Sequence, residues 1–323
     1  MEWGPLAEQV AQVLAAGLTT GALYGLTCVG LALIFGTMRV INFAQGEFIM
    51  MGMYGAVGVA GLLAGPAPLG VGWLGAAAPF VSAVVISPAM FVFGALLHRV
   101  LITRTTGARA ATLSGGGHQA QLILTLGVAL VLQNLALILI GSSPVSLVSP
   151  LSSSAWEIPL LLDEDATLFL NKGAVLAALV GALAAVLVFR LIRSTELGKS
   201  LRAAADDPDA ATYMGIDVDR AHRVAFGLGT AVAGLAGGLL VLSHPVQPFV
   251  GVDFIVIMYA GVVMGGMGSI TGAFWGGMAI GLVQQVSTLF LPLQLQNAAV
   301  FLLFVLVLLF RPQGLFGRSV ERA

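Results

Sequence analysis

Four polar side chains lie within nine residues at the edge of an otherwise apolar region. Arg39, Asn42, Gln45 and Glu47 belong to the stretch MRVINFAQGEFIMMGMY, residues 38–54. A carboxyl group inside a membrane costs about 2.5–3.5 kcal/mol on insertion scales, so Glu47 should face other helices or water, with Arg39 as a candidate partner. Such groups can contact a polar substrate in transit, or they can cap a re-entrant turn. Both interpretations stay open, and both allow Asn42 to cap the next helix.

A second stretch combines glycines that favour helix packing with glycines that favour a break. Residues 259–277 read YAGVVMGGMGSITGAFWGG and contain three GxxxG spacings, which let helices approach backbone to backbone. The same glycines allow the chain to turn inside a membrane where the turn is buried or lines a cavity. Interrupted segments in both halves of a chain indicate a transport site, with helix packing as the alternative. The candidates for a translocation path are Asn42, Gln45, Glu47, Gly265 and Gly268.

The longest charge-dense stretch is the loop of residues 194–223, which separates two apolar spans. Ser194 or Thr195 can cap a helix whose first turn contains Glu196, where the helix dipole favours an acid. Leu197, Leu201 and Ala205 recur at every fourth position and predict a narrow apolar stripe. The start and stop signals of a second helix follow in order at Asp207, Pro208 and Gly215.

This loop therefore predicts a structured helix pair on the water-facing side of the chain. A purely solvated surface element does not need an apolar stripe followed by Tyr213 and Met214. Binding of a soluble partner is the favoured interpretation, and a solvated element is the alternative.

The residue types that build enzymes and metal sites are not grouped in this chain. The single cysteine, Cys28, lies inside an apolar span, and the four histidines lack ligand spacing. The sequence contains no Walker A motif, and no Ser-His-Asp set, HExxH motif or clustered carboxylate pair lies within the apolar spans. We therefore expect a non-enzymatic chain without metal or cofactor. The amide pairs Gln133-Asn134 and Gln284-Gln285 are interpreted as hydrogen-bonding groups between helices.

Composition places the chain in a membrane. Of its 323 residues 58% are hydrophobic and only 9% are charged, against about 25% charged in soluble domains. The net charge of -1 argues against nucleic-acid binding. Because a crossing helix needs about 20 residues, we expect an all-α polytopic protein with one transmembrane domain, residues 1–323, and eight or nine membrane segments. These are Val13–Ile34, Ala44–Leu63, Ala76–Leu97, Gln119–Ile140, Gly173–Ile192, Val224–Ser243, Phe254–Met267 (short, with a half-helix as the alternative), Ala273–Leu291 and Asn297–Phe310.

Charge asymmetry predicts the orientation. If the segments alternate, every Lys and Arg except Lys172 lies on one side, which the positive-inside rule makes cytoplasmic. This arrangement places the N-terminus outside and the C-terminus in the cytoplasm, provided that the number of crossings is odd.

Residues 141–171 form the longest external loop. We interpret this loop as a connector with a short interfacial helix, or as a docking site for a soluble binding protein. The external side receives Glu2, Glu8, Glu157, Asp163, Glu164, Asp165 and Asp253, with Trp3, Trp73 and Trp156 as interface anchors.

Four motifs together resemble the LivH-type permeases of branched-chain amino-acid ABC transporters. They are GLALIFG with VINFAQGEF, ELGKSLRAAADDPDAATYMGIDVDR, GGMGSITGA and FRPQGLFGR, in the order and spacing of that family and over nearly the whole chain. Gln45 stands where the family usually has His, so a transport role of that His is not carried over to this chain.

The resemblance implies a multi-pass subunit of a bacterial inner-membrane importer. Two cytoplasmic ATPases, a second permease and an extracytoplasmic solute-binding protein would be its partners. Urea or other amide permeases of the same family are the alternative for the substrate. A stand-alone channel or secondary carrier is the alternative of another class. The positions that match the family's ATPase-coupling segment are Glu196, Gly198, Arg202, Ala205, Asp207 and Gly215.

Overall fold

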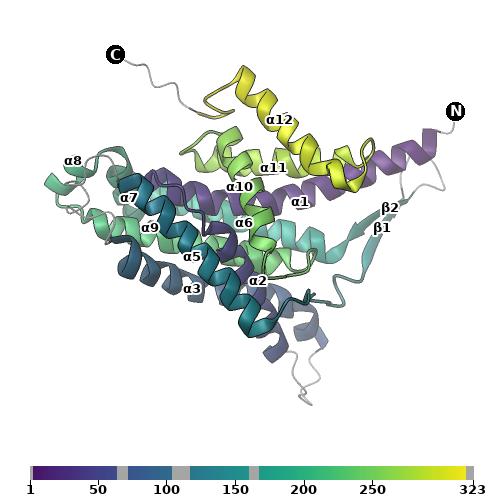
Figure 1. Cartoon of the computed structure of the whole chain (residues 1–323). Coiled ribbons are helices and arrows are strands. Elements are labelled where there is room, and N and C mark those ends of the chain that lie inside the picture. Colours follow the sequence, from purple (N-terminus) through teal and green to yellow (C-terminus); the bar gives the residue numbers. More distant parts are fainter. Residues whose placement is uncertain (1–2, 64–71, 104–116, 160–166, 318–323) are drawn as a thin grey trace.

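Long apolar helices form the body of the molecule (Figure 1). The computed structural model describes residues 3–63, 72–103, 117–159 and 167–317. Six helices in this described part are long and apolar enough to cross a membrane, which confirms the all-α polytopic class. The elements are α1 (Trp3–Met38), α2 (Gln45–Leu63), α3 (Gly72–Leu97), η1 (His98–Ile102), α5 (Gly117–Ile140), β1 (Ala155–Pro159), β2 (Thr167–Asn171), α6 (Lys172–Ser194), α7 (Glu196–Asp206), α8 (Pro208–Tyr213), α9 (Val218–Leu240), α10 (Val250–Gly265), α11 (Ile270–Ser287), η2 (Leu293–Leu295) and α12 (Gln296–Phe310).

Helices α1 and α9 form the centre of the bundle. Helix α1 packs against α6, α9, α10 and α11, and α9 also packs against α2 and α3. In both central helices 78% of the most apolar window is buried, against 28% or less in α3, α5 and α6. The peripheral helices therefore present apolar side chains outward, as expected where lipid or another membrane subunit covers them.

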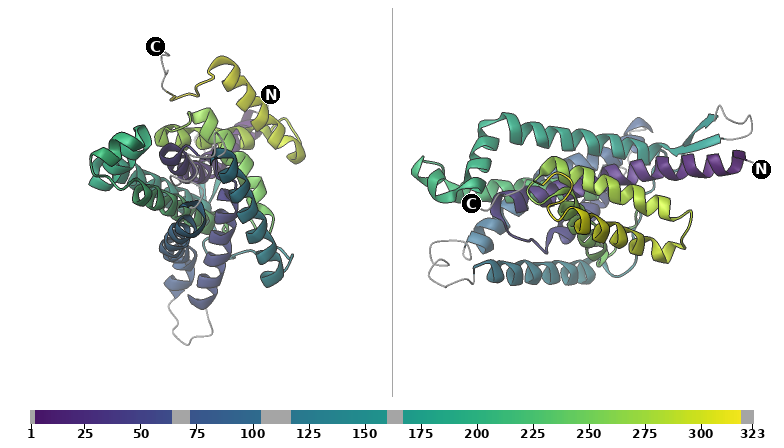
Figure 2. Two further views of the ribbon diagram at one scale, coloured as in Figure 1. Left: turned by 60° about the vertical axis from the view of Figure 1, so that its left-hand side comes forward. Right: turned by 90° about the horizontal axis from the view of Figure 1, so that it is seen from above.

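The two ends of the bundle carry different elements. Figures 1 and 2 show α7 and α8 at one end, and the hairpin β1–β2 with the start of α1 at the other. The amide of Gln12 in α1 donates to the backbone oxygen of Phe169 at 2.7 Å and so ties α1 to the hairpin. The predicted cytoplasmic loop and the predicted external loop thus lie at opposite ends, as the charge pattern requires.

One expectation about the elements needs correction. Helix α1 contains the predicted span Val13–Ile34 and extends ten residues before it, to Trp3. The expected interfacial helix in the external loop is wrong: the described part of that loop contains the antiparallel pair β1–β2, with Ala155 opposite Asn171. Alternation of Trp156 and Ile158 with polar residues suits a strand better than a helix.

The short seventh segment is confirmed. Helix α10 has 16 residues and is therefore about 24 Å long, less than the hydrocarbon core of about 30 Å.

The side chains of Trp3 and Trp73 are not described. The predicted topology markers that lie outside the described residues are Glu2, Arg104, Arg109, Asp163, Glu164, Asp165, Arg318 and Arg322.

Candidate functional site

The chain folds back sharply between α1 and α2, in a segment of residues 39–44 that we call the elbow. Arg39 has a positive φ of 53°, a left-handed conformation that is uncommon outside glycine, and it reverses the chain at the end of α1. The side-chain oxygen of Asn42 accepts from the amide of Ala44 at 3.1 Å. This contact confirms that Asn42 caps the entry to α2. Asn42 also donates to the side chain of Gln45 at 3.1 Å.

The elbow is anchored to the centre of the bundle through Gln45. Its amide nitrogen donates to the carbonyl oxygen of Gly229 in α9 at 3.2 Å, and the side chain is fully buried. A Cβ on Gly30 of α1 would lie 3.2 Å from the same nitrogen. Small residues on two helices therefore make room for this amide, and a larger imidazole ring at position 45 would need different neighbours.

Glu47 lies one half-turn further along α2 and is 2% exposed. Its Oε1 accepts from Nε2 of Gln133 in α5 at 2.7 Å, and its Oε2 has no hydrogen-bond partner among the described residues. A Cβ on Gly251 of α10 would lie 2.5 Å from Oε1. The expected pairing with Arg39 is wrong, because the elbow leaves Arg39 exposed while Glu47 enters the contact between α2, α5 and α10. The interpretation as an interhelical hydrogen-bonding group is confirmed for Gln133 and wrong for Asn134, which donates to the carbonyl oxygen of Leu130 within α5 at 2.8 Å.

Replacing Gln133 with leucine should destabilise the chain by about 1.5–3 kcal/mol, because the buried Glu47 carboxyl then loses its only donor in the described structure. The unfolding temperature of the purified chain in detergent measures this effect. Glu47→Gln in the same background should restore part of the loss, since a neutral amide is cheaper to bury than a carboxylate. An unchanged unfolding temperature in Gln133→Leu would contradict the assigned contact.

The glycine-rich stretch lies in different surroundings from Glu47. Gly265 at the end of α10 packs against the backbone of Gly272 in α11, so its surroundings match the helix-packing alternative. Gly268 adopts a left-handed φ of 90° in the turn between these helices. A Cβ on Gly36 at the end of α1 would lie 3.6 Å from Gly268. Asn42, Gln45 and Glu47 therefore gather on the elbow and α2, whereas Gly265 and Gly268 belong to the turn near the end of α1.

The predicted caps of the α7–α8 pair are all formed. Thr195 accepts from the amide of Gly198 at 3.1 Å and begins α7. Asp207 accepts from the amides of Asp209 and Ala210, each at 3.0 Å, and begins α8. Gly215 ends α8 with a φ of 82°, which a residue without Cβ adopts at little cost. Each cap contributes about 1 kcal/mol, so the pair has a defined conformation.

The buried face of α7 differs from the predicted stripe. Leu201 is 1% exposed and packs with Leu33 and Ile192, together with the small residues Gly198 and Ala204 of α7. Leu197 is 41% exposed, so the stripe of Leu197, Leu201 and Ala205 does not share one environment. The reason is that α7 rests across the ends of α1, α6 and α9, which cover a face centred on Leu201.

The contact between α6 and α7 is a backbone contact. A Cβ on Gly198 would lie 2.6 Å from the Cα of Ile192 and closer still to its carbonyl carbon and oxygen. Arg202, one turn further along α7, donates to the same carbonyl oxygen. The end of α6 is thus held from two positions of α7, and only glycine fits at position 198.

The tip of the α7–α8 pair faces water and carries large apolar side chains. Tyr213 is 89% exposed and Met214 is 82% exposed. In the first turns of α7, Lys199 donates to Glu196 at 2.8 Å and holds the pKa of that carboxyl below its ordinary value. Exposed aromatic and methionine side chains beside charged groups are typical of a protein-binding surface.

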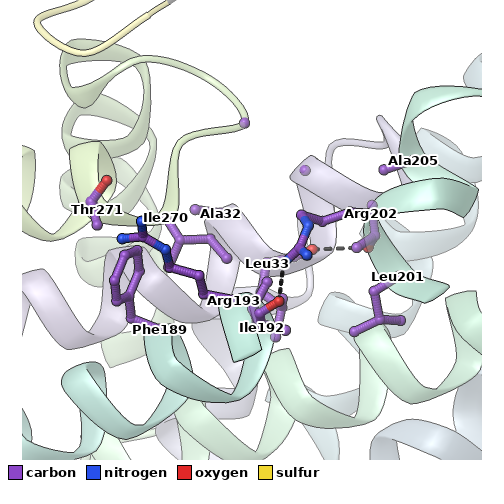
Figure 3. Close-up of a pocket in the computed structure, with 13 residues that line it drawn as sticks. Ala32, Leu33, Phe189, Ile192, Arg193, Leu201, Arg202, Ala205, Ile270 and Thr271 are labelled. Atoms are coloured by element: carbon purple, nitrogen blue, oxygen red, sulfur yellow. Dashed lines mark hydrogen bonds between the residues drawn. The ribbon is translucent and has the colours of Figure 1, made fainter. Parts of the chain in front are cut away.

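A pocket of about 600 Å³ lies behind α7, and Figure 3 shows the side chains around it. Arg202, Ala205 and Gly268 line this pocket. The sequence analysis assigned Arg202 and Ala205 to ATPase coupling, and it assigned Gly268 to the translocation path. The structure brings them together because the turn between α10 and α11 meets the end of α1 beside α7. Sequence reasoning missed Phe189 and Ile270, which complete the wall, because no spacing in the sequence links them.

Comparison with known proteins gives one consistent result. A family model described as "Branched-chain amino acid transport system / permease component" matches residues 13–310. The chain is 31% identical to the high-affinity branched-chain amino acid permease LivH of Escherichia coli K12, over 95% of both chains. It is 30% identical to BraD of Pseudomonas aeruginosa, over 96% of this chain and 97% of that one. It is 28% identical to a probable LivH of Methanocaldococcus jannaschii, over 94% and 92%. No solved structure matches.

Proposed function

The chain belongs to the family of permease components of branched-chain amino acid transport systems, and from this premise we propose that it is the membrane permease of an ABC importer for these amino acids. The observation that carries the proposal is the capped α7–α8 pair with its exposed Tyr213 and Met214. This pair offers the exposed surface on which a partner ATPase docks.

The coupling positions act through the backbone contact between α7 and α6. Gly198 and Arg202 hold the carbonyl group of Ile192, so movement of α7 is transmitted to α6 as a rigid-body displacement. The caps at the ends of α8 keep the tip in one conformation while the ATPase pushes against it. The residues assigned to this role are Glu196, Gly198, Arg202, Ala205, Asp207 and Gly215.

The translocation path passes the elbow and the start of α2. Buried amides and a carboxyl group there provide polar contacts for a zwitterion on its way through an apolar bundle, and the start of α10 forms the opposite wall at Gly251. Asn42, Gln45 and Glu47 form this part of the path, and Gly265 and Gly268 shape its end beside α7. A second permease completes the path, and a solute-binding protein docks at the hairpin end. In a bacterial inner membrane the C-terminus then lies in the cytoplasm.

Reconstitution into proteoliposomes tests this function. The chain together with its ATPases, second permease and binding protein should accumulate leucine only when ATP is present on the ATPase side. The chain alone should not accumulate leucine. Accumulation by the chain alone would make it a self-sufficient carrier, and uptake of urea in place of leucine by the complete complex would reassign the substrate.

A further inference from the structure

The pocket behind α7 opens beside the ends of α1 and α6, at the level where the membrane-spanning helices stop. Its volume is about 600 Å³. Figure 3 shows Arg193 and Phe189 on one side and Arg202 on the other, with Ile270 and Thr271 of α11 beside them. Four separate elements therefore form one cavity at the boundary between the apolar bundle and water.

Two guanidinium groups make the pocket cationic. Arg193 at the end of α6 is exposed, and its guanidinium lies 5.8 Å from the ring centre of Phe189. Arg202 donates to the carbonyl oxygen of Ile192, which holds its side chain across the pocket wall. None of the described residues that line the pocket is acidic. An arginine has five donors, so both side chains keep hydrogen-bonding capacity for an anion.

An apolar groove continues from this pocket between α6 and α11. It has a volume of about 210 Å³ and shares Phe189, Ile270 and Thr271 with the pocket. Its remaining lining is apolar and includes Phe274 and Trp275, whose side chain is 54% exposed. Since both helices are membrane segments, the groove runs along the side of the bundle within the membrane.

We propose that this composite site binds an anionic phospholipid. The phosphate of the headgroup lies between Arg193 and Arg202, and one acyl chain lies in the groove over Trp275. Basic pockets between membrane helices on the cytoplasmic side favour anionic headgroups, and guanidinium groups bind phosphate oxygens with charge-assisted hydrogen bonds. A soluble anion makes no contact with the groove, and a zwitterionic headgroup adds an ammonium group that the two arginines repel.

The position of this lipid gives it a mechanical role. The headgroup touches the end of α6 and the buried side of α7, next to the backbone contact of Gly198 with Ile192. A bound lipid therefore supports α7 from behind, on the side away from the exposed tip. This assignment does not depend on the transported amino acid, so it can fail or hold independently of the proposed function.

Fluorescence quenching by brominated lipids tests the proposal on the full chain. The protein has four tryptophans, and replacing Trp3, Trp73 and Trp156 with phenylalanine leaves Trp275 as the reporter. In vesicles of mixed composition, brominated phosphatidylglycerol should occupy the groove about thirtyfold better than brominated phosphatidylcholine, because each of the two cations near the headgroup provides about fivefold. Arg193→Gln should reduce the ratio to about fivefold, and Arg193→Lys should retain most of the original ratio.

Arg190→Gln is the matched control, because Arg190 is exposed on the same helix one turn away and does not line the pocket. It should leave the ratio unchanged. Equal quenching by both lipids in the unsubstituted pocket would overturn the proposal, and so would a preference that Arg193→Gln leaves undiminished. Competition by millimolar glycerophosphoglycerol, which has the headgroup without chains, would make the site one for soluble phosphates. Loss of quenching on adding the ATPase subunits would assign the pocket to the partner protein instead.

Discussion

Replacing Gly198 with alanine should lower ATP-driven leucine uptake by about tenfold or more, within the range of coupling energies between linked sites. The added methyl group would meet the backbone of Ile192, including its Cα at 2.6 Å. A backbone cannot rotate away as a side chain can, so α7 has to leave the end of α6. The hydrogen bond from Arg202 to the same carbonyl group should be lost with it.

The assembled importer in proteoliposomes measures this effect, with uptake and substrate-stimulated ATPase activity recorded together. The membrane helices should remain folded, because the atoms nearest to an added Cβ all belong to Ile192 at the end of α6. Gly127→Ala on α5 is a suitable control, since a Cβ there meets nothing within 4 Å. Normal uptake by the Gly198→Ala importer would refute transmission through this contact.

Replacing Gly52 with valine should prevent normal packing of α2 against α9. A Cβ at this position would lie 2.6 Å from the Cα of Gly234 and closer to its carbonyl oxygen. Overpacking of this kind costs about 3 kcal/mol, so the unfolding temperature of the purified chain should fall by about 5–10 °C. The elbow moves with α2, so leucine uptake should be lost as well.

The matched variant is Gly58→Val on the same helix. A Cβ at position 58 meets nothing within 4 Å, so the unfolding temperature should change by no more than about 2 °C, as for other surface substitutions. Both variants introduce the same side chain into the same helix and differ only in the opposing surface. If both lower the unfolding temperature equally, intrinsic helix preference explains the effect and the assigned contact does not.

The membrane segments and the caps of the α7–α8 pair were predictable because they depend on neighbours in the chain. An apolar run of sufficient length forms a helix wherever it lies in a membrane. Thr195, Asp207 and Gly215 act on amides or carbonyls within a few residues, and the structure forms each predicted contact. The expectation for the external loop was wrong because a hairpin is not local in this sense. It depends on pairing between two strands across the loop, and neither strand alone predicts it.

The surroundings of the candidate site were not predictable from the chain alone. Glu47 and Gln133 are 86 residues apart, and the nearby cation, Arg39, was the natural candidate partner. The choice between them depends on the elbow, which leaves Arg39 exposed and directs Glu47 into the contact with α5. Likewise, the buried face of α7 depends on where α1, α6 and α9 end. The spacing of Leu197, Leu201 and Ala205 does not indicate where those three helices end.

The amino-acid sequence by itself thus determined the class of the protein, its membrane segments and the caps of the α7–α8 pair. These properties follow from local composition and from backbone groups within reach of the same few residues. Only the tertiary structure decided that Gln133 and Gly251 surround Glu47, that Gly198 rests on Ile192, and that Arg193 faces Arg202 across a pocket. Such contacts join distant segments, and which segments meet is decided by how closely the glycine-bearing helices can approach one another.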